Sequence, residues 1–197
     1  MASRRSGPRR SRLPGPRDWT RTRFRFRYGS IAVRPADLGT PVSDSHRIVK
    51  IELDERGLIR RSPQVEHERK VAIYDLIEEN KFAVIGFPGP YALYLGVAEN
   101  RLAFDVRDAA GGDLTRFALP LAPFKMIVKD YFTLCESYFA AIKTATPSRI
   151  EAIDIGRRGL HNEGAELLKE RLADKAVVDF NTARRLFTLL CVLHIKA

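Results

Sequence analysis

Short runs of alternating apolar and polar residues in the first half of the folded part predict β-strands. The first covers residues 48–53, where apolar positions alternate with Lys50 and Glu52. A second apolar run, residues 82–85, ends at the turn-forming sequence Gly-Phe-Pro-Gly-Pro. Three more β-prone runs follow it, at residues 91–97, 102–107 and 114–119. Because only short turns separate these three, they should pair antiparallel as a meander.

Helical spacing of apolar residues marks the other elements. Ser62 and Pro63 are an N-cap and a first helical position, and the helix that they begin should end near Asn80. Apolar residues at intervals of three and four predict a long core helix over residues 124–142.

The C-terminal third continues the helical pattern with an expected interruption. Thr146 and Pro147 begin another helix that runs toward Gly156, where a break is plausible. A further helix is predicted at residues 163–172 and a small strand at 177–178. A strongly apolar helix then runs through residue 193, capped by Asp179 or Asn181.

Together these elements predict an α+β fold, in which a small antiparallel meander sheet packs against a C-terminal group of helices. We expect one domain over residues 42–197, which is long enough to bury a core without disulfides or metal staples. Cys135 and Cys191 each lie in an apolar stretch and should be buried in that core.

The first 41 residues are rich in arginine and proline and should form a disordered tail. Its aromatic and arginine residues could contact nucleic acid, and its composition also resembles a transit peptide. We favour a third interpretation, in which translation begins near Val42 and residues 1–41 are a start-site extension. The tail carries most of the formal net charge of +10, so the domain is nearly neutral and nucleic acid would bind only through the tail.

Several familiar kinds of chemistry are excluded by missing motifs. The sequence has neither GxGxxG nor GxxxxGK[ST], so it gives no support for a dinucleotide or P-loop site. His67-Glu68 resembles the start of a zinc-protease helix, but Val71 stands where the second imidazole is needed. His161-x-Glu163 has the spacing of zinc deaminases and lacks their paired cysteines. We therefore predict no metal and no cofactor.

One short segment, residues 154–166, combines groups that could bind and process an anion. The ligand-binding candidates are Asp154, Arg157, Arg158 and Asn162, and the catalytic candidates are His161 and Glu163. Arginine pairs bidentately with phosphate or carboxylate, and histidine titrates near neutral pH. If the segment is helical throughout, Asp154, Arg158 and His161 share one face.

The same segment also has a purely structural interpretation, which we favour. Gly156 and Gly159 suit the C-terminus of a helix, and Asn162 suits the N-cap of the next one. In that case Arg157 and Arg158 would bridge carboxylates in a packed helical corner. Glu66, His67 and Glu68 are expected to lie on a solvated helix face.

Several segments of this domain resemble those of uncharacterised protein family 0262, a set of small bacterial proteins. They are Glu66-His67-Glu68-Arg69, Lys129-Asp130-Tyr131-Phe132, Thr144-Ala145-Thr146-Pro147, the run from Ile153 to Gly164, and Thr182-Ala183-Arg184-Arg185-Leu186-Phe187. The resemblance begins near Ser43 and runs to the C-terminus. It implies no activity, cofactor or catalytic residue.

Two functions from different classes follow from the residues. The first, which we favour, is a protein-binding or regulatory domain, consistent with a nearly neutral surface and no complete catalytic constellation. The second is a small enzyme or sensor that binds a phosphorylated or carboxylated molecule at residues 154–166. The longest apolar run is too short to cross a membrane, and the two isolated cysteines fit a cytoplasmic location. Oligomeric state is left open.

Overall fold

Four strands form the main sheet of the domain, in the order β1-β3-β4-β5. The structure is a computed structural model that describes residues 45–54 and 63–194. The strands are β1 (Ile48–Leu53), β3 (Tyr91–Ala98), β4 (Arg101–Asp108) and β5 (Asp113–Pro120). The β3–β4–β5 meander is antiparallel as predicted, whereas β1 pairs with β3 in parallel.

Alternation along the strands places apolar side chains on one face of this sheet. Leu102, Phe104 and Val106 of β4 are almost completely buried. Asp105 lies between them on the opposite face, where its carboxylate pairs with Arg107 at 2.8 Å and with Arg116 at 3.1 Å. The apolar face is therefore the one available for helices.

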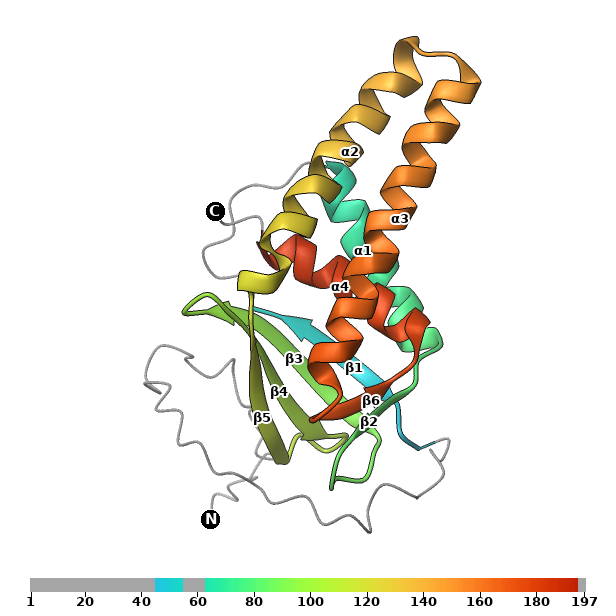
Figure 1. Ribbon diagram of the computed structural model, residues 1–197. Helices are drawn as coiled ribbons and strands as arrows, with labels where there is room; N and C mark the ends of the chain where they lie inside the picture. Colours follow the sequence, from blue (N-terminus) through green and yellow to red (C-terminus); the bar gives the residue numbers. More distant parts are fainter. Residues whose placement is uncertain (1–44, 55–62, 195–197) are drawn as a thin grey trace, which may run out of the picture. The chain divides into compact units, whose positions relative to one another are not determined.

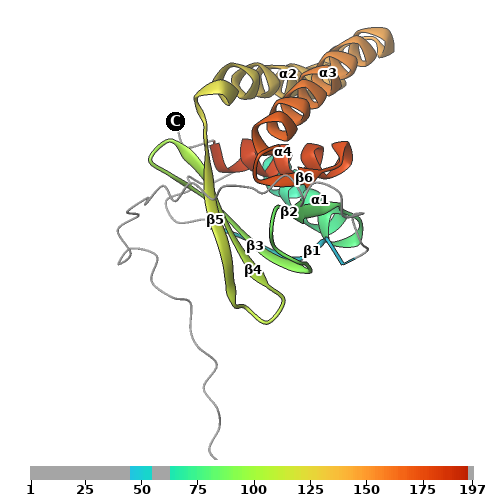
Figure 2. The same ribbon diagram turned by 60° about the horizontal axis from the view of Figure 1, so that its bottom comes forward.

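Four helices complete the domain: α1 (Pro63–Glu78), α2 (Lys125–Thr144), α3 (Pro147–Leu172) and α4 (Phe180–His194). Helix α1 contacts β1 and α4, and α4 contacts β3. Helix α3 packs on α4 and pairs with α2, so α1 and α4 lie between the sheet and the α2–α3 pair (Figures 1 and 2). The one-turn helix η2 (Ala122–Phe124) joins β5 to α2.

Helix α4 supplies the centre of the core. Nine of its fifteen residues are buried, among them Leu186, Phe187 and Leu190. Its N-terminus is capped by Asp179, whose Oδ1 accepts a hydrogen bond from the backbone N–H of Thr182 at 2.8 Å. Asp179 is thus one of the two caps that the sequence predicts.

A second, two-stranded sheet pairs β2 (Phe82–Val84) with β6 (Ala176–Val178) in antiparallel register. This pairing ties the segment after α1 to the segment before α4. The hydroxyl of Thr182 adds a link there, because it accepts a hydrogen bond from the backbone N–H of Lys81 at 2.9 Å. The predicted strands at 82–85 and 177–178 are therefore present.

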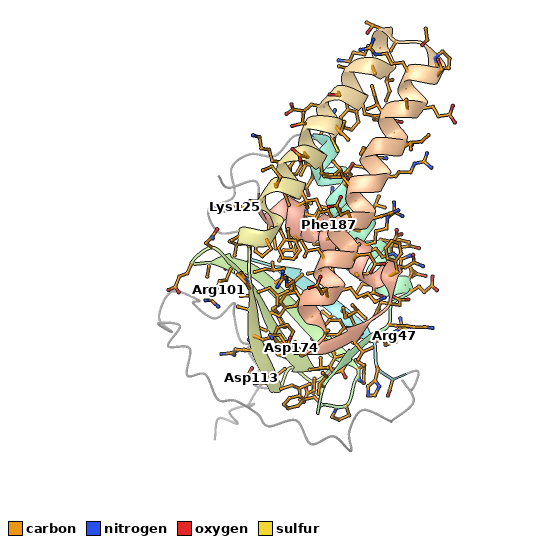
Figure 3. All side chains as sticks on the ribbon, in the orientation of Figure 1. Arg47, Arg101, Asp113, Lys125, Asp174 and Phe187 are labelled. Atoms are coloured by element: carbon orange, nitrogen blue, oxygen red, sulfur yellow. The ribbon has the colours of Figure 1, made fainter. Side chains whose placement is uncertain are left out.

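The predicted break near Gly156 is wrong, because α3 is one helix from Pro147 to Leu172. Glycine within a helix costs only about 1 kcal/mol, which packing against neighbouring helices can offset. A third glycine, Gly164, has a packing function: a Cβ there would lie 2.2 Å from Cζ of Phe187. Figure 3 labels Phe187, the fully buried α4 residue at this contact.

The α+β class with its antiparallel meander and C-terminal helices is confirmed. Both cysteines are buried and free, as expected for core residues. The predictions for residues 1–41 and for the Ser62 cap lie outside the described residues. In the part of the chain that the structure describes, no helix is both long and apolar enough to span a bilayer.

The glycines of α3 provide a direct test of this packing. Gly164→Ala should lower the free energy of unfolding by about 1–3 kcal/mol, because the added methyl group collides with the buried ring of Phe187. Gly159 has open space around its Cβ position, so Gly159→Ala should raise the free energy of unfolding by about 0.5–1 kcal/mol. Urea unfolding of both variants measures the contrast. Equal stability of Gly164→Ala and the parent would contradict the close α3–α4 contact.

Candidate functional site

Helices α1, α2 and α3 line a cavity of about 390 Å³ that is open to solvent. The lining side chains come from the first turns of α1, the C-terminal half of α2 and the middle of α3: Pro63, Gln64, His67, Glu68, Tyr138, Phe139 and Arg157. The two polar segments that the sequence analysis treated separately therefore meet here. Glu68 and His67 come from one, and Arg157 comes from the other.

Arg157 is held in place by its neighbours. Its Nε and Nη2 donate hydrogen bonds to Asp154 Oδ1, at 3.1 and 2.8 Å. Its guanidinium carbon lies 5.4 Å from the ring centroid of Tyr138, a cation–π distance. The side chain is 26% exposed, so the charge is partly shielded but reaches the cavity.

Asp154 forms ion pairs with two arginines, Arg157 and Arg158. Arg158 Nε donates to Asp154 Oδ2 at 2.7 Å, and Arg158 Nη2 contacts the same oxygen. Hydrogen bonds from Arg157 and then from Arg158 lower the pKa of Asp154 below its ordinary value. The carboxylate is thus ionised and fully engaged, and its role is to orient Arg157. Arg158 is 63% exposed and does not line the cavity.

Tyr131 and Cys135, both buried residues of α2, lie close to Glu68 and Arg157. The Tyr131 hydroxyl donates to Glu68 Oε2 at 3.4 Å, a long contact. Burial, reinforced by the charge of Glu68, raises the pKa of Tyr131 and raises that of the Cys135 thiol to about 11. Both groups therefore stay protonated and neutral at pH 7, and the thiol is a poor nucleophile.

His161 lies deeper, between α3 and α4. Arg184 Nε donates to His161 Nδ1 at 3.0 Å, and His161 Nε2 lies 2.8 Å from the hydroxyl of Thr188. Since Nδ1 accepts a hydrogen bond from Arg184, Nε2 carries the ring proton. Nε2 therefore donates a hydrogen bond to the hydroxyl oxygen of Thr188. The ring is also stacked on Tyr131, with the centroids 5.3 Å apart.

The environment keeps His161 uncharged. Burial, followed by the charges of Arg184 and Arg157, lowers the pKa of His161 to about 4. Both ring nitrogens already have partners within the helices. His161 therefore functions here as a neutral bridge between α3 and α4.

The predicted site residues separate onto different faces of α3. Asp154, Arg157 and Arg158 come together, and His161 lies one turn further along the same inward-facing side. Asn162 and Glu163 are exposed to solvent. The structure therefore does not bring Asn162 and Glu163 to the cavity, and a functional role for these six residues remains a prediction.

Sequence reasoning missed the partners that complete the site. Tyr138 has the spacing of an ordinary core residue, and Glu68 was placed on a solvated face, although it is half-buried. One signal was present for the His161 partners. Arg184 and Thr188 are polar residues four positions apart in α4, which puts them on one face of that helix.

The arrangement is suited to binding an anion beside an apolar surface. Arg157 offers a fixed guanidinium, and Tyr138 and Phe139 offer aromatic walls. Among the residues that the structure describes, no group of three or more histidine, cysteine or acidic side chains could hold a metal ion. The side chains that line the cavity offer hydrogen bonding and charge pairing.

Comparison with known proteins confirms the resemblance found in the sequence. A family model described as Uncharacterised protein family (UPF0262) matches residues 45–196. A UPF0262 protein of Rhodospirillum rubrum is 60% identical over 155 residues, which cover 79% of this chain and 96% of the relative. One from Paramagnetospirillum magneticum is 64% identical over 151 residues, covering 76% of this chain and 96% of the relative. No solved structure matches the chain.

The buried histidine should make stability depend on pH. An unfolded histidine binds a proton below about pH 6.5, whereas folded His161 does so only near pH 4. The contribution of His161 to the free energy of unfolding, on the order of 3 kcal/mol, is present above pH 6.5 and is lost as the pH falls toward 4. Urea unfolding at pH 7, 5.5 and 4.5 should show this loss in the parent and a shallower loss in His161→Gln.

His194 serves as the comparison, because burial followed by the charge of Lys125 lowers its pKa as well. The His194→Gln variant should retain the part of the pH dependence that belongs to His161. A His161→Gln variant with the full pH dependence of the parent would contradict a neutral, buried His161.

Proposed function

The chain belongs to the uncharacterised protein family UPF0262, and we propose that its domain is a regulatory module that binds a small anionic molecule at Arg157. This combines the regulatory function favoured by the sequence with the anion sensor that was its alternative. The proposed ligand is a phosphorylated or carboxylated metabolite, and the proposed site is the cavity between α1, α2 and α3.

The observation that carries the proposal is a guanidinium fixed at the wall of a cavity. Asp154 holds one edge of Arg157, so little side-chain entropy remains to be lost when a ligand binds. A volume of about 390 Å³ lies at the lower end of small-molecule sites, which favours a metabolite over a nucleotide cofactor.

The protonation states support binding over catalysis. A general acid or base works best with a pKa near the operating pH, and a cysteine nucleophile needs a low one. The pKa of His161 is lowered to about 4, and that of Cys135 is raised to about 11. We therefore assign no catalytic step to His161, and Glu163, at the solvent face of α3, has no part in the proposed site.

Protein binding is the second candidate, supported by exposed apolar residues on the α2–α3 pair. Phe139 and Ile142 of α2 are 37% and 51% exposed, and Ile155 of α3 is 62% exposed. Exposed apolar groups of this size often mark contact surfaces. A regulatory domain could use both surfaces, one for a ligand and one for a partner.

Arg157 can be tested with 3-phenylpropionate and phenyl phosphate, which each join an anion to one aromatic ring. At least one should bind the parent with a Kd of about 1 mM or tighter, because ligands of this size gain a few tenths of a kcal/mol per atom. Arg157→Lys should weaken that binding about tenfold, since lysine keeps the charge but loses the planar fork. Isothermal titration calorimetry gives the affinities.

Arg158→Lys is the matched control, because Arg158 shares Asp154 but lies outside the cavity lining. Its binding should equal that of the parent. If neither probe binds the parent, or if both arginine variants lose affinity equally, the anion site at Arg157 is wrong.

A further inference from the structure

Opposite charges line the same cavity on different helices. Glu68 projects from α1, and Arg157 projects from α3. Among the described residues, no ion pair joins the two, and Arg157 is paired with Asp154 instead. From this arrangement we infer that the ligand is a zwitterion, a free α-amino acid with an apolar side chain, whose carboxylate meets Arg157 and whose ammonium meets Glu68. The inference rests on the proposed function and narrows its ligand class.

Glu68 is the residue at which we expect the ligand to place a positive charge. Its carboxylate is half-buried at the cavity wall, and its hydrogen-bond partner is the neutral hydroxyl of Tyr131 at 3.4 Å. Within the described part of the chain, no lysine, arginine or histidine forms a salt bridge with Glu68. A partly buried carboxylate is stabilised by an opposite charge, and an ammonium group on the ligand would supply one.

Arg157 remains able to bind a second carboxylate. Asp154 accepts from Nε and Nη2, whereas a guanidinium has five N–H donors. Tyr131 and Cys135 also interact with the guanidinium. A ligand carboxylate would take the donors that these groups and Asp154 leave. Asp154 pairs with both Arg157 and Arg158, whereas Glu68 lines the cavity without an ion pair among the described residues.

The neighbouring residues Tyr131 and Cys135 add no charge of their own. Tyr131 contacts Glu68, and its raised pKa means that the phenol adds no negative charge of its own. Cys135 is likewise a neutral thiol. The ligand thus meets one negative and one positive wall, as a zwitterion requires.

The remaining lining is mainly apolar and fits an apolar side chain, with Gln64 and His67 of α1 beside it. Tyr138 and Phe139 of α2 contribute aromatic surface, and Pro63 of α1 contributes more apolar surface. A volume of about 390 Å³ accommodates an amino acid with an aliphatic or aromatic side chain.

A phosphate ester fits this cavity less well. It would bring close to two negative charges beside the carboxylate of Glu68, with one guanidinium to balance them. An α-amino acid has no net charge and offers one partner to each wall. Of the two ligand classes in the proposed function, the charge pattern therefore favours a carboxylated molecule over a phosphorylated one.

Three probes isolate the two charges of the ligand. L-Phenylalanine carries both, 3-phenylpropionate lacks the ammonium, and 2-phenylethylamine lacks the carboxylate. Calorimetry with the full chain should give L-phenylalanine an affinity at least tenfold higher than either of the others. L-Leucine, titrated in parallel, should bind as well, because the walls are apolar and not specific for an aromatic ring.

Glu68→Gln then assigns the ammonium site. It should weaken L-phenylalanine about tenfold and leave 3-phenylpropionate unchanged, while Glu78→Gln, an exposed acid in the last turn of α1, should bind both as the parent does. Equal affinity of the parent for L-phenylalanine and 3-phenylpropionate would contradict the inference that the ligand is a zwitterion. The proposed anion site at Arg157 would still stand. Absence of binding by all probes would overturn both, and an unchanged L-phenylalanine affinity in Glu68→Gln would overturn the role of Glu68.

Discussion

The contact between Gly164 of α3 and the ring of Phe187 on α4 sets the rotation of α3 about its own axis. With Gly164 turned toward α4, the residues three and seven positions earlier, His161 and Arg157, must also face inward. His161 then reaches the polar side chains of α4, and Arg157 reaches the cavity. Every feature of the site depends on this rotation, because a shift of one residue would turn Arg157 to a different side of the helix.

The local elements could be predicted because their signals are local. Alternating apolar residues and short turns specify the β3–β4–β5 meander without reference to the rest of the chain. The parallel pairing of β1 with β3 was not predictable in this way, since the two strands are joined through α1 and β2. The helix break at Gly156 was mispredicted for a related reason. The low helix propensity of glycine can be read from the sequence, whereas the packing against α2 and α4 that offsets it cannot.

The site was predictable only in part. The sequence gathers polar residues in one short segment, but a helix distributes consecutive residues around its axis. Arg157 and His161 therefore face inward, whereas Asn162 and Glu163 face solvent. The opposing wall comes from Glu68, which contacts a tyrosine 63 positions away in the chain. Such a contact leaves no pattern in a single sequence, because spacing rules describe neighbours within one element only.

The central position of α4 has a consequence for the synthesis of the protein. Helix α4 follows every other described element in chain order, and nine of its residues fill the core. Until residues 180–194 have left the ribosome, the apolar face of the sheet and the inner sides of α1 and α3 lack one of their packing partners. The β2–β6 pair also forms late, since β6 directly precedes α4 in the chain. The nascent chain therefore exposes apolar surface until the last helix arrives, and exposed apolar surface of this kind favours aggregation.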